Sequence, residues 1–109
     1  EKKTKTFIEV KNVTLSRKPG IAEFPDAVTE RGSKHISELI NAKREGYKSY
    51  ILFVVQRNDC KYFKIASDID TKYSKLIKEA IKKKINILCY DCKFSSKGIK
   101  LNREIKFEI

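Results

Sequence analysis

The first clear pattern along the chain runs from Thr6 to Val13, where charged and apolar side chains alternate. A period of two predicts a β-strand whose successive side chains point to opposite faces. Glu9 and Lys11 therefore share one face of this predicted strand. The Pro and Gly residues that follow predict a loop from about Leu15 to Asp26.

Two later segments have the spacing of helices. The first is predicted from about Ala27 to Glu45, with Gly46 as its stop. The second is predicted from a cap at Asp68 or Asp70 to about Lys84. The inner stripes of the two helices are expected to carry Val28, His35, Ile36, Leu39 and Ile40, and then Tyr73, Leu76, Ile77, Ala80 and Ile81.

Apolar runs between and after these helices predict further strands. Ser49 to Val55 is almost continuously apolar, which is typical of a strand buried on both faces. Ile85–Tyr90 and Ile99–Ile109 are predicted as strands, while Tyr62–Ala66 stays ambiguous. The order β-α-β-α-β-β predicts an α/β fold, a mixed sheet flanked by helices.

Length and composition narrow the class of protein. The 109 residues are enough for one compact domain and too few for two. No apolar run approaches the roughly 20 residues that cross a bilayer, so no membrane contact is expected. The amino terminus has neither an apolar secretion signal nor an initiator Met, so we expect a cytoplasmic protein and a fragment of a longer one.

The charge balance predicts a polyanionic partner. Lys and Arg total 25 and Asp and Glu total 14, so the formal net charge is +11. Such an excess attracts nucleic acid, and the small number of Arg residues predicts DNA contacts to phosphate with low sequence specificity. A merely solvated lysine surface is the alternative. The candidates for phosphate contact are Lys18, Lys34, Lys72, Lys75, Lys78, Lys82 and Lys83.

The triplet Glu9-Val10-Lys11 is the candidate catalytic motif. A strand holds two such side chains side by side, with roots roughly 6.5–7 Å apart. Metal-dependent phosphodiester cleavage uses this pair: the carboxylate binds Mg²⁺, and the Lys orients or activates the attacking water. The alternative is a solvated ion pair, since such triplets are common on exposed strands.

Histidine and cysteine offer weaker signals. His35, the single histidine, has no cluster of Cys or carboxylates around it, which favours a structural role. Cys89 and Cys92 form a C-x-x-C at the end of a predicted strand, but a zinc site would need a second pair. We therefore expect these two residues and Cys60 to be free thiols without a function.

Two segments resemble the sugar fermentation stimulation protein A family. The first is Ile8-Glu9-Val10-Lys11-Asn12-Val13-Thr14-Leu15. The second is Phe24-Pro25-Asp26-Ala27-Val28-Thr29-Glu30-Arg31-Gly32, followed by Lys34-His35 and Glu38-Leu39. The resemblance covers nearly the whole chain from about Phe7 onward, and the second segment is long and irregular enough to make a chance match improbable.

The resemblance implies a C-terminal domain similar to PD-(D/E)XK nucleases, which have a restriction-endonuclease-like fold, with an OB-like domain before it in the family. It implies a DNA-binding protein with a regulatory role in sugar (maltose) metabolism, or alternatively a Mg²⁺-dependent nuclease. Glu9 and Lys11 would be the E-x-K half of the nuclease signature. The candidates near this site are Asp26, Thr29, Glu30, Arg31 and His35.

The acidic half of that signature, an Asp on the preceding strand, is missing from this sequence. A metal needs at least two oxygen donors placed together, and Glu9 supplies one, with Asp26 or Glu30 as candidates for another. We therefore expect weak binding of Mg²⁺ or Mn²⁺ and no cleavage by this chain alone. The strand Thr6–Val13 would also lack a neighbour, and its unpaired edge predicts pairing of two chains as a homodimer.

Overall fold

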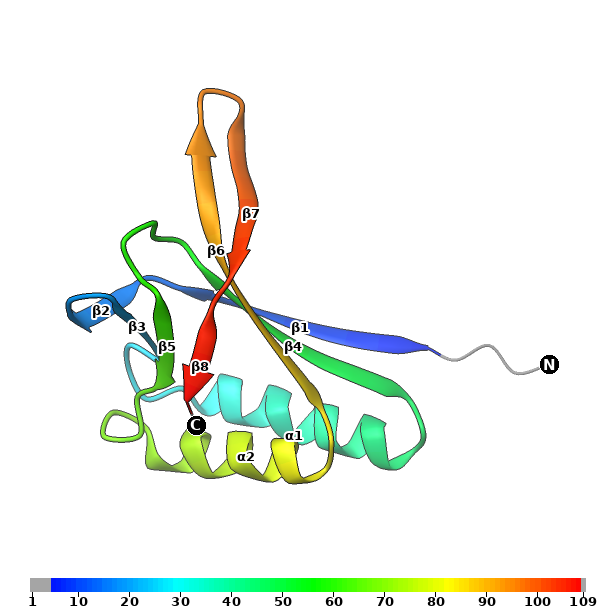
Figure 1. Ribbon diagram of the computed structural model, residues 1–109. Coiled ribbons are helices and arrows are strands. Elements are labelled where there is room, and N and C mark those ends of the chain that lie inside the picture. The colour runs from blue at the N-terminus through cyan, green and yellow to red at the C-terminus, as the bar shows by residue number, and fades with distance from the viewer. Residues whose placement is uncertain (1–4, 109) are drawn as a thin grey trace.

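The computed structural model describes residues 5–108 (Figure 1). The elements within this range are, in chain order, β1 (Thr6–Val13), β2 (Leu15–Lys18), β3 (Ile21–Phe24), α1 (Glu30–Arg44), β4 (Lys48–Val55), β5 (Tyr62–Ile65), α2 (Thr71–Lys82), β6 (Asn86–Ser95), β7 (Gly98–Glu104) and β8 (Lys106–Glu108). Among these residues, no helix is long and apolar enough to cross a membrane.

The main sheet has the strand order β1-β4-β6-β7. β1, β4 and β6 are parallel, and β7 runs antiparallel to β6. A helix lies between each two consecutive parallel strands in the chain, and both helices pack on the same side of the sheet (Figure 1). The predicted mixed α/β sheet is confirmed. Within the described residues β1 is an edge strand, so one side of its backbone has no strand partner.

A second, smaller sheet corrects the predicted loop between Leu15 and Asp26. β2 and β3 form an antiparallel hairpin there, and the sheet continues through β5 to β8. The turn of the hairpin needs Gly20, whose φ of 79° lies in the left-handed region. Pro and Gly thus mark a tight turn between two short strands rather than a long loop. The same sheet assigns the ambiguous Tyr62–Ala66 segment to a strand, β5.

The first helix begins later than predicted. α1 starts at Glu30 because Thr29 is its N-cap, with its hydroxyl accepting a hydrogen bond from the Gly32 backbone N–H at 2.9 Å. Val28 therefore lies before the helix and is 70% exposed, not part of its inner stripe. The predicted stop at Gly46 is confirmed by its φ of 95°.

The second helix is capped by Asp70, which settles the choice between two aspartates. Tyr73, Ile77 and Ala80 are buried on its inner stripe as predicted, but Ile81 is 40% exposed and lies off it. The apolar stripe is therefore narrower than the spacing suggested.

Two strand predictions also need correction. β4 is not buried equally on both faces: Ile51, Phe53 and Val55 are buried, whereas the alternate residues are half-buried. The predicted final strand is split at the buried Ile105, so that β7 pairs in the main sheet and β8 in the small one. β6 is longer than predicted and runs through Cys89 and Cys92 rather than ending there.

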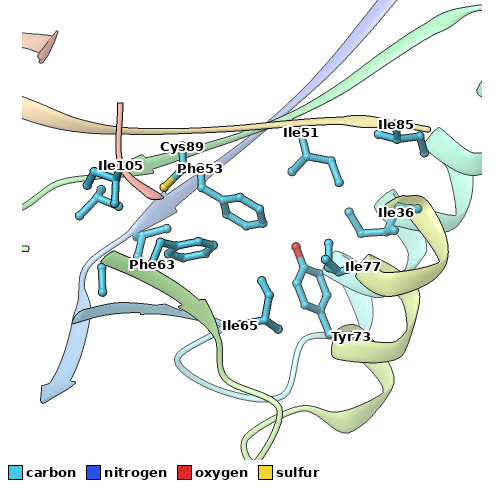
Figure 2. Packing of buried hydrophobic residues seen from close by; sticks show 14 of the residues in the cluster. Ile36, Ile51, Phe53, Phe63, Ile65, Tyr73, Ile77, Ile85, Cys89 and Ile105 are labelled. Carbon is cyan, nitrogen blue, oxygen red and sulfur yellow. The ribbon is translucent and has the colours of Figure 1, made fainter. Parts of the chain in front are cut away.

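The core fills the space between the helices, the main sheet and β5. Figure 2 shows Ile36, Ile77 and Tyr73 reaching from the helices toward Ile51 and Phe53. The rings of Phe53 and Phe63, from the two different sheets, have centroids 4.6 Å apart. This packing holds both helices rigidly against the inner face of the main sheet, and Glu9 and Lys11 lie on that face at its β1 edge.

Candidate functional site

Glu9 and Lys11 project from the middle of β1 toward α1, as their shared face predicts. The distance from Lys11 Nζ to Glu9 Oε1 is 3.2 Å. The two side chains are only 12% exposed for Lys11 and 27% for Glu9. The pair is therefore partly shielded from water, unlike a solvated surface pair, and its charges interact more strongly than exposed ones.

His35 joins this pair from α1. Its Nδ1 lies 3.1 Å from Glu9 Oε1 and 3.0 Å from Lys11 Nζ. Glu9, Lys11 and His35 thus form a triangle of three polar atoms, which we call the EKH cluster. The sequence alone favoured a structural role for this histidine, because the approach of α1 to β1 cannot be read from local spacing.

A cavity of about 160 Å³ opens beside the EKH cluster between β1 and α1. Glu38, one helical turn after His35, contributes a second carboxylate to its wall. This residue was missed as a site candidate, although its spacing of three from His35 places both on one helix face. The full lining is Phe7, Ile8, Glu9, His35, Glu38, Leu39 and Ala42.

The other residues expected near the site do not line this cavity. Asp26, Glu30 and Arg31 are exposed, and none of them lines the cavity beside Glu9. Thr29 acts as the helix cap, and its backbone N–H also donates to Asp70 Oδ2 at 2.9 Å. Of the two acids considered as partners for Glu9, the structure brings neither to the cavity.

Five of the predicted phosphate-contacting lysines lie together, and the other two lie on separate elements. Those of the second helix all project from the exposed side of α2, along a shallow groove that also contains Leu76 and Glu79. Lys18 and Lys34 are exposed on β2 and α1. We call the first group the α2 lysine face; it consists of Lys72, Lys75, Lys78, Lys82 and Lys83.

One tyrosine hydroxyl, that of Tyr73, is buried in the core. The Tyr73 ring is fully buried, and its hydroxyl has no hydrogen-bond partner among the described residues. Burial raises the pKa of Tyr73 most, and the negative charges of Glu9 and Asp70 raise it further. The Glu9 carboxylate is thus close enough to influence groups in the core.

The cysteines lie away from this cluster. Cys60, Cys89 and Cys92 are free thiols and all are buried. Burial raises the pKa of Cys89 to about 12, with a further contribution from Asp91. A thiol of this kind stays protonated and unreactive at neutral pH.

A divalent cation fits the chemistry of the site in part. Carboxylate oxygen is the ligand type that Mg²⁺, Mn²⁺ and Ca²⁺ prefer. The shortest distances from Lys11 Nζ and His35 Nδ1 to the Glu9 carboxylate both end at Oε1. No group of three or more metal-ligating residues occurs among residues 5–108, so the donors here form an incomplete set to which a cation would add water or further ligands.

Comparison with solved structures defines the class of this domain. The structure of Pyrococcus furiosus SfsA in complex with Ca²⁺ matches with a TM-score of 0.85 and 31% identity. The match covers 94% of this chain and 44% of that chain. The fold, two helices against a mixed sheet, is that of a restriction-endonuclease-like domain.

The family follows from the sequence comparison. The family model SfsA, described as the sugar fermentation stimulation protein RE domain, matches residues 1–98. The chain therefore belongs to the sugar fermentation stimulation protein family. Its relatives include homologues from Pelagibacter ubique, 55% identical over 95% of this chain, and from Maricaulis maris, 41% identical over 94%. The chain spans 45% and 44% of the lengths of these two relatives.

Proposed function

We propose that this chain is the nuclease-like part of a DNA-binding protein, and that the whole protein hydrolyses phosphodiester bonds with a divalent cation. The observation that carries the proposal is the EKH cluster, with three polar atoms within 3.2 Å of one another on a partly shielded sheet edge. The Ca²⁺ complex of the Pyrococcus furiosus relative supports a cation as cofactor, with Mg²⁺ or Mn²⁺ as the ion proposed for catalysis.

In this proposal each residue of the chain has a separate task. Glu9 holds the cation, which when bound activates water and neutralises charge on the phosphate. Lys11 contributes an ammonium that is held in place by its neighbours, and it offsets phosphate charge and orients the attacking water. β1 fixes the spacing between the two side chains, so little reorganisation is needed when substrate binds.

The second acidic ligand is proposed to come from outside this chain. The chain spans less than half of the relatives that it matches, and the resemblance implies an Asp on the strand before β1. That strand would also cover the edge of β1, which has no partner among the described residues. Among the acids of residues 5–108, Glu38, on the wall of the same cavity, is best placed to substitute.

A cleavage assay tests the proposal. Plasmid and single-stranded DNA are incubated with Mg²⁺ or Mn²⁺ and either the whole protein or this chain. We expect cleavage by the whole protein, loss of cleavage in its Glu9→Ala and Lys11→Ala variants, and none by this chain. Lys93→Ala, which removes an exposed lysine of β6, is the matched control and should retain activity. Cleavage that survives Glu9→Ala would disprove the assignment.

DNA binding through the α2 lysine face is a separate proposal. All five of its lysines are exposed, and within residues 5–108 none of them forms an ion pair. Glu79 is the single acidic residue among them. Contact with the phosphate backbone is therefore expected to dominate, with little preference for sequence.

A salt series tests this second proposal against a charge-matched control. Lys75→Gln/Lys78→Gln/Lys82→Gln removes three charges from α2, and Lys93→Gln/Lys97→Gln/Lys100→Gln removes three from the β6–β7 hairpin. We expect the α2 variant to lower the slope of log K against log salt by about 0.9 for each lost phosphate contact. Equal slopes for both variants would mean that only net charge matters.

We also propose the regulatory role in sugar (maltose) metabolism that the resemblance implies. It needs selective binding at particular promoters by the whole protein, whereas the α2 lysine face favours binding without sequence preference. Competition between a candidate promoter fragment and a duplex of scrambled sequence distinguishes these two expectations. Equal affinity for both fragments would contradict a regulatory role that acts through sequence recognition by this domain.

A further inference from the structure

We propose that His35 is a positioning residue whose Nδ1 accepts a hydrogen bond from Lys11 when Glu9 is engaged by a divalent cation. In this way His35 keeps the Lys11 ammonium next to the reacting phosphate. The inference rests on the proposed function, since it concerns the same site, but it assigns a role to a residue on α1 that the E-x-K motif does not contain.

The Lys11 ammonium has few acceptors around it within the described residues. Its side chain is only 12% exposed, so its ammonium depends on polar partners within the protein. The described contacts of Lys11 Nζ are two: Glu9 Oε1 at 3.2 Å and His35 Nδ1 at 3.0 Å. If the cation occupies Glu9, the first partner is withdrawn and the second remains.

The chemistry of imidazole allows only one of the two contacts of His35 Nδ1 to be a hydrogen bond. A ring nitrogen either carries a proton and donates, or carries a lone pair and accepts. Nδ1 accepts the hydrogen bond from Lys11 Nζ at 3.0 Å and therefore carries a lone pair, so its approach to Glu9 Oε1 at 3.1 Å is a close contact without a hydrogen bond. Engagement of Glu9 by a cation leaves this hydrogen bond intact, because the carboxylate, and not the imidazole, then takes the cation.

Without an acceptor on α1, the bound cation would displace Lys11. Two positive groups that share one carboxylate repel each other, and the four-carbon stem of lysine allows the ammonium to move away. His35 opposes this movement from a rigid position, because the next residue, Ile36, is fully buried in the core. The ring is therefore held by the helix and not by the cation.

Two experiments on the whole protein test this role. In a crystal structure with Ca²⁺, we expect the ion at Glu9 and Lys11 Nζ still within hydrogen-bond distance of His35 Nδ1.

In cleavage assays, His35→Leu should lower kcat by about 10- to 100-fold. KM for DNA and the half-saturating Mg²⁺ concentration should change by less than about threefold. His35→Asn, which keeps an acceptor near the position of Nδ1, should recover most of kcat. Asn41→Leu, an exposed polar position on the same helix, is the control for helix stability.

Each outcome decides between the two proposals. Ca²⁺ at Glu9 with Lys11 turned away from His35 overturns the positioning role and leaves the metal site intact. If His35→Asn is as slow as His35→Leu, the positioning role is also overturned. If both variants also need a higher Mg²⁺ concentration for half-saturation, His35 is a ligand of the cation instead. Ca²⁺ at Glu9 with Lys11 on His35, but no cleavage by the unmodified protein, supports the positioning role and refutes the nuclease. Absence of Ca²⁺ from Glu9 refutes both.

Discussion

The EKH cluster and the Asp91–Arg103 pair are two partly buried charge clusters that differ in how fully the carboxylate is hydrogen-bonded. Asp91, on β6, is fully buried and accepts from the Arg103 backbone N–H at 2.7 Å and from its Nε and Nη2 at 3.0 and 2.7 Å. The Glu9 carboxylate accepts no hydrogen bond among residues 5–108, its shortest charge-pair contacts both end at Oε1, and it lies beside a cavity. A saturated carboxylate holds two strands together, whereas an unsaturated one can still accept a ligand.

Asp70 extends the comparison to the helices. Its Oδ1 accepts from the Tyr73 backbone N–H at 3.0 Å, and its Oδ2 accepts from that of Thr29 at 2.9 Å. One carboxylate thus serves the N-terminal ends of both α1 and α2, where helix dipoles favour negative charge. Like Asp91, it uses both oxygens within the protein, and we assign it to structure rather than to chemistry.

The largest effect on stability is expected for Asp91→Ala. It removes the acceptor of three hydrogen bonds and leaves the Arg103 backbone N–H without one, so the free energy of unfolding should fall by about 3 kcal/mol. The Arg103 side chain is 55% exposed and can turn to water, which keeps the loss at the lower end for buried pairs. Urea unfolding measures it. A loss as small as that of Glu104→Ala, at an exposed neighbour on β7, would show that Asp91 does not hold the two strands together.

A smaller loss is expected for Asp70→Ala. An N-cap contributes about 1 kcal/mol, and this residue serves two helix ends, so about 2 kcal/mol should be lost. Amide exchange should also quicken in the first turns of both α1 and α2. Asp26→Ala, at an exposed aspartate outside both helices, is the control. Faster exchange in α2 alone would show that the contact to Thr29 contributes little.

Glu9→Gln should change the free energy of unfolding little, in contrast to Asp91→Ala. The carboxylate is 27% exposed and its ion pairs are partly screened by water, so we expect a change below about 1 kcal/mol in urea unfolding. Cleavage by the whole protein should nevertheless be lost, because Glu9 is the proposed cation ligand. A loss of stability close to that of Asp91→Ala would place Glu9 among the structural carboxylates and weaken the proposed function.

The same contrast separates what sequence patterns can predict from what they cannot. A period of two places Glu9 and Lys11 on one face of β1, because strand geometry is local. The contact of His35 with this pair depends on how α1 crosses the sheet, a property of tertiary packing that spacing within one helix does not contain. Glu38 was missed for the same reason.

Errors in the strands have a similar origin. Pro19 and Gly20 are compatible with both a loop and a hairpin turn, and only the pairing of β3 with β5 decides between them. The break at Ile105 arises because one chain segment serves two sheets, which a continuous alternating pattern conceals. Asp70 was one of two equivalent capping candidates, and the structure shows that Asp70 is the one that accepts from the Tyr73 backbone N–H.

The smallest effect is expected for exposed ion pairs, and it should appear only in acid. Arg17 binds Asp68 and holds the pKa of that carboxyl at about 2, below its ordinary 3.8. Because the pKa is lower in the folded chain, the pair adds stability above about pH 4 and loses it as the pH falls toward about 2. Arg17→Gln should therefore flatten the dependence of unfolding free energy on pH in this window.

Arg57→Gln is the informative control, since Arg57 lowers the pKa of Asp59 to a similar value. Arg57 and Asp59 are two residues apart and can stay close in the unfolded chain, whereas Arg17 and Asp68 are brought together only by folding. Equal flattening by both variants would show that the shifted pKa alone, and not the long-range contact, sets the acid response.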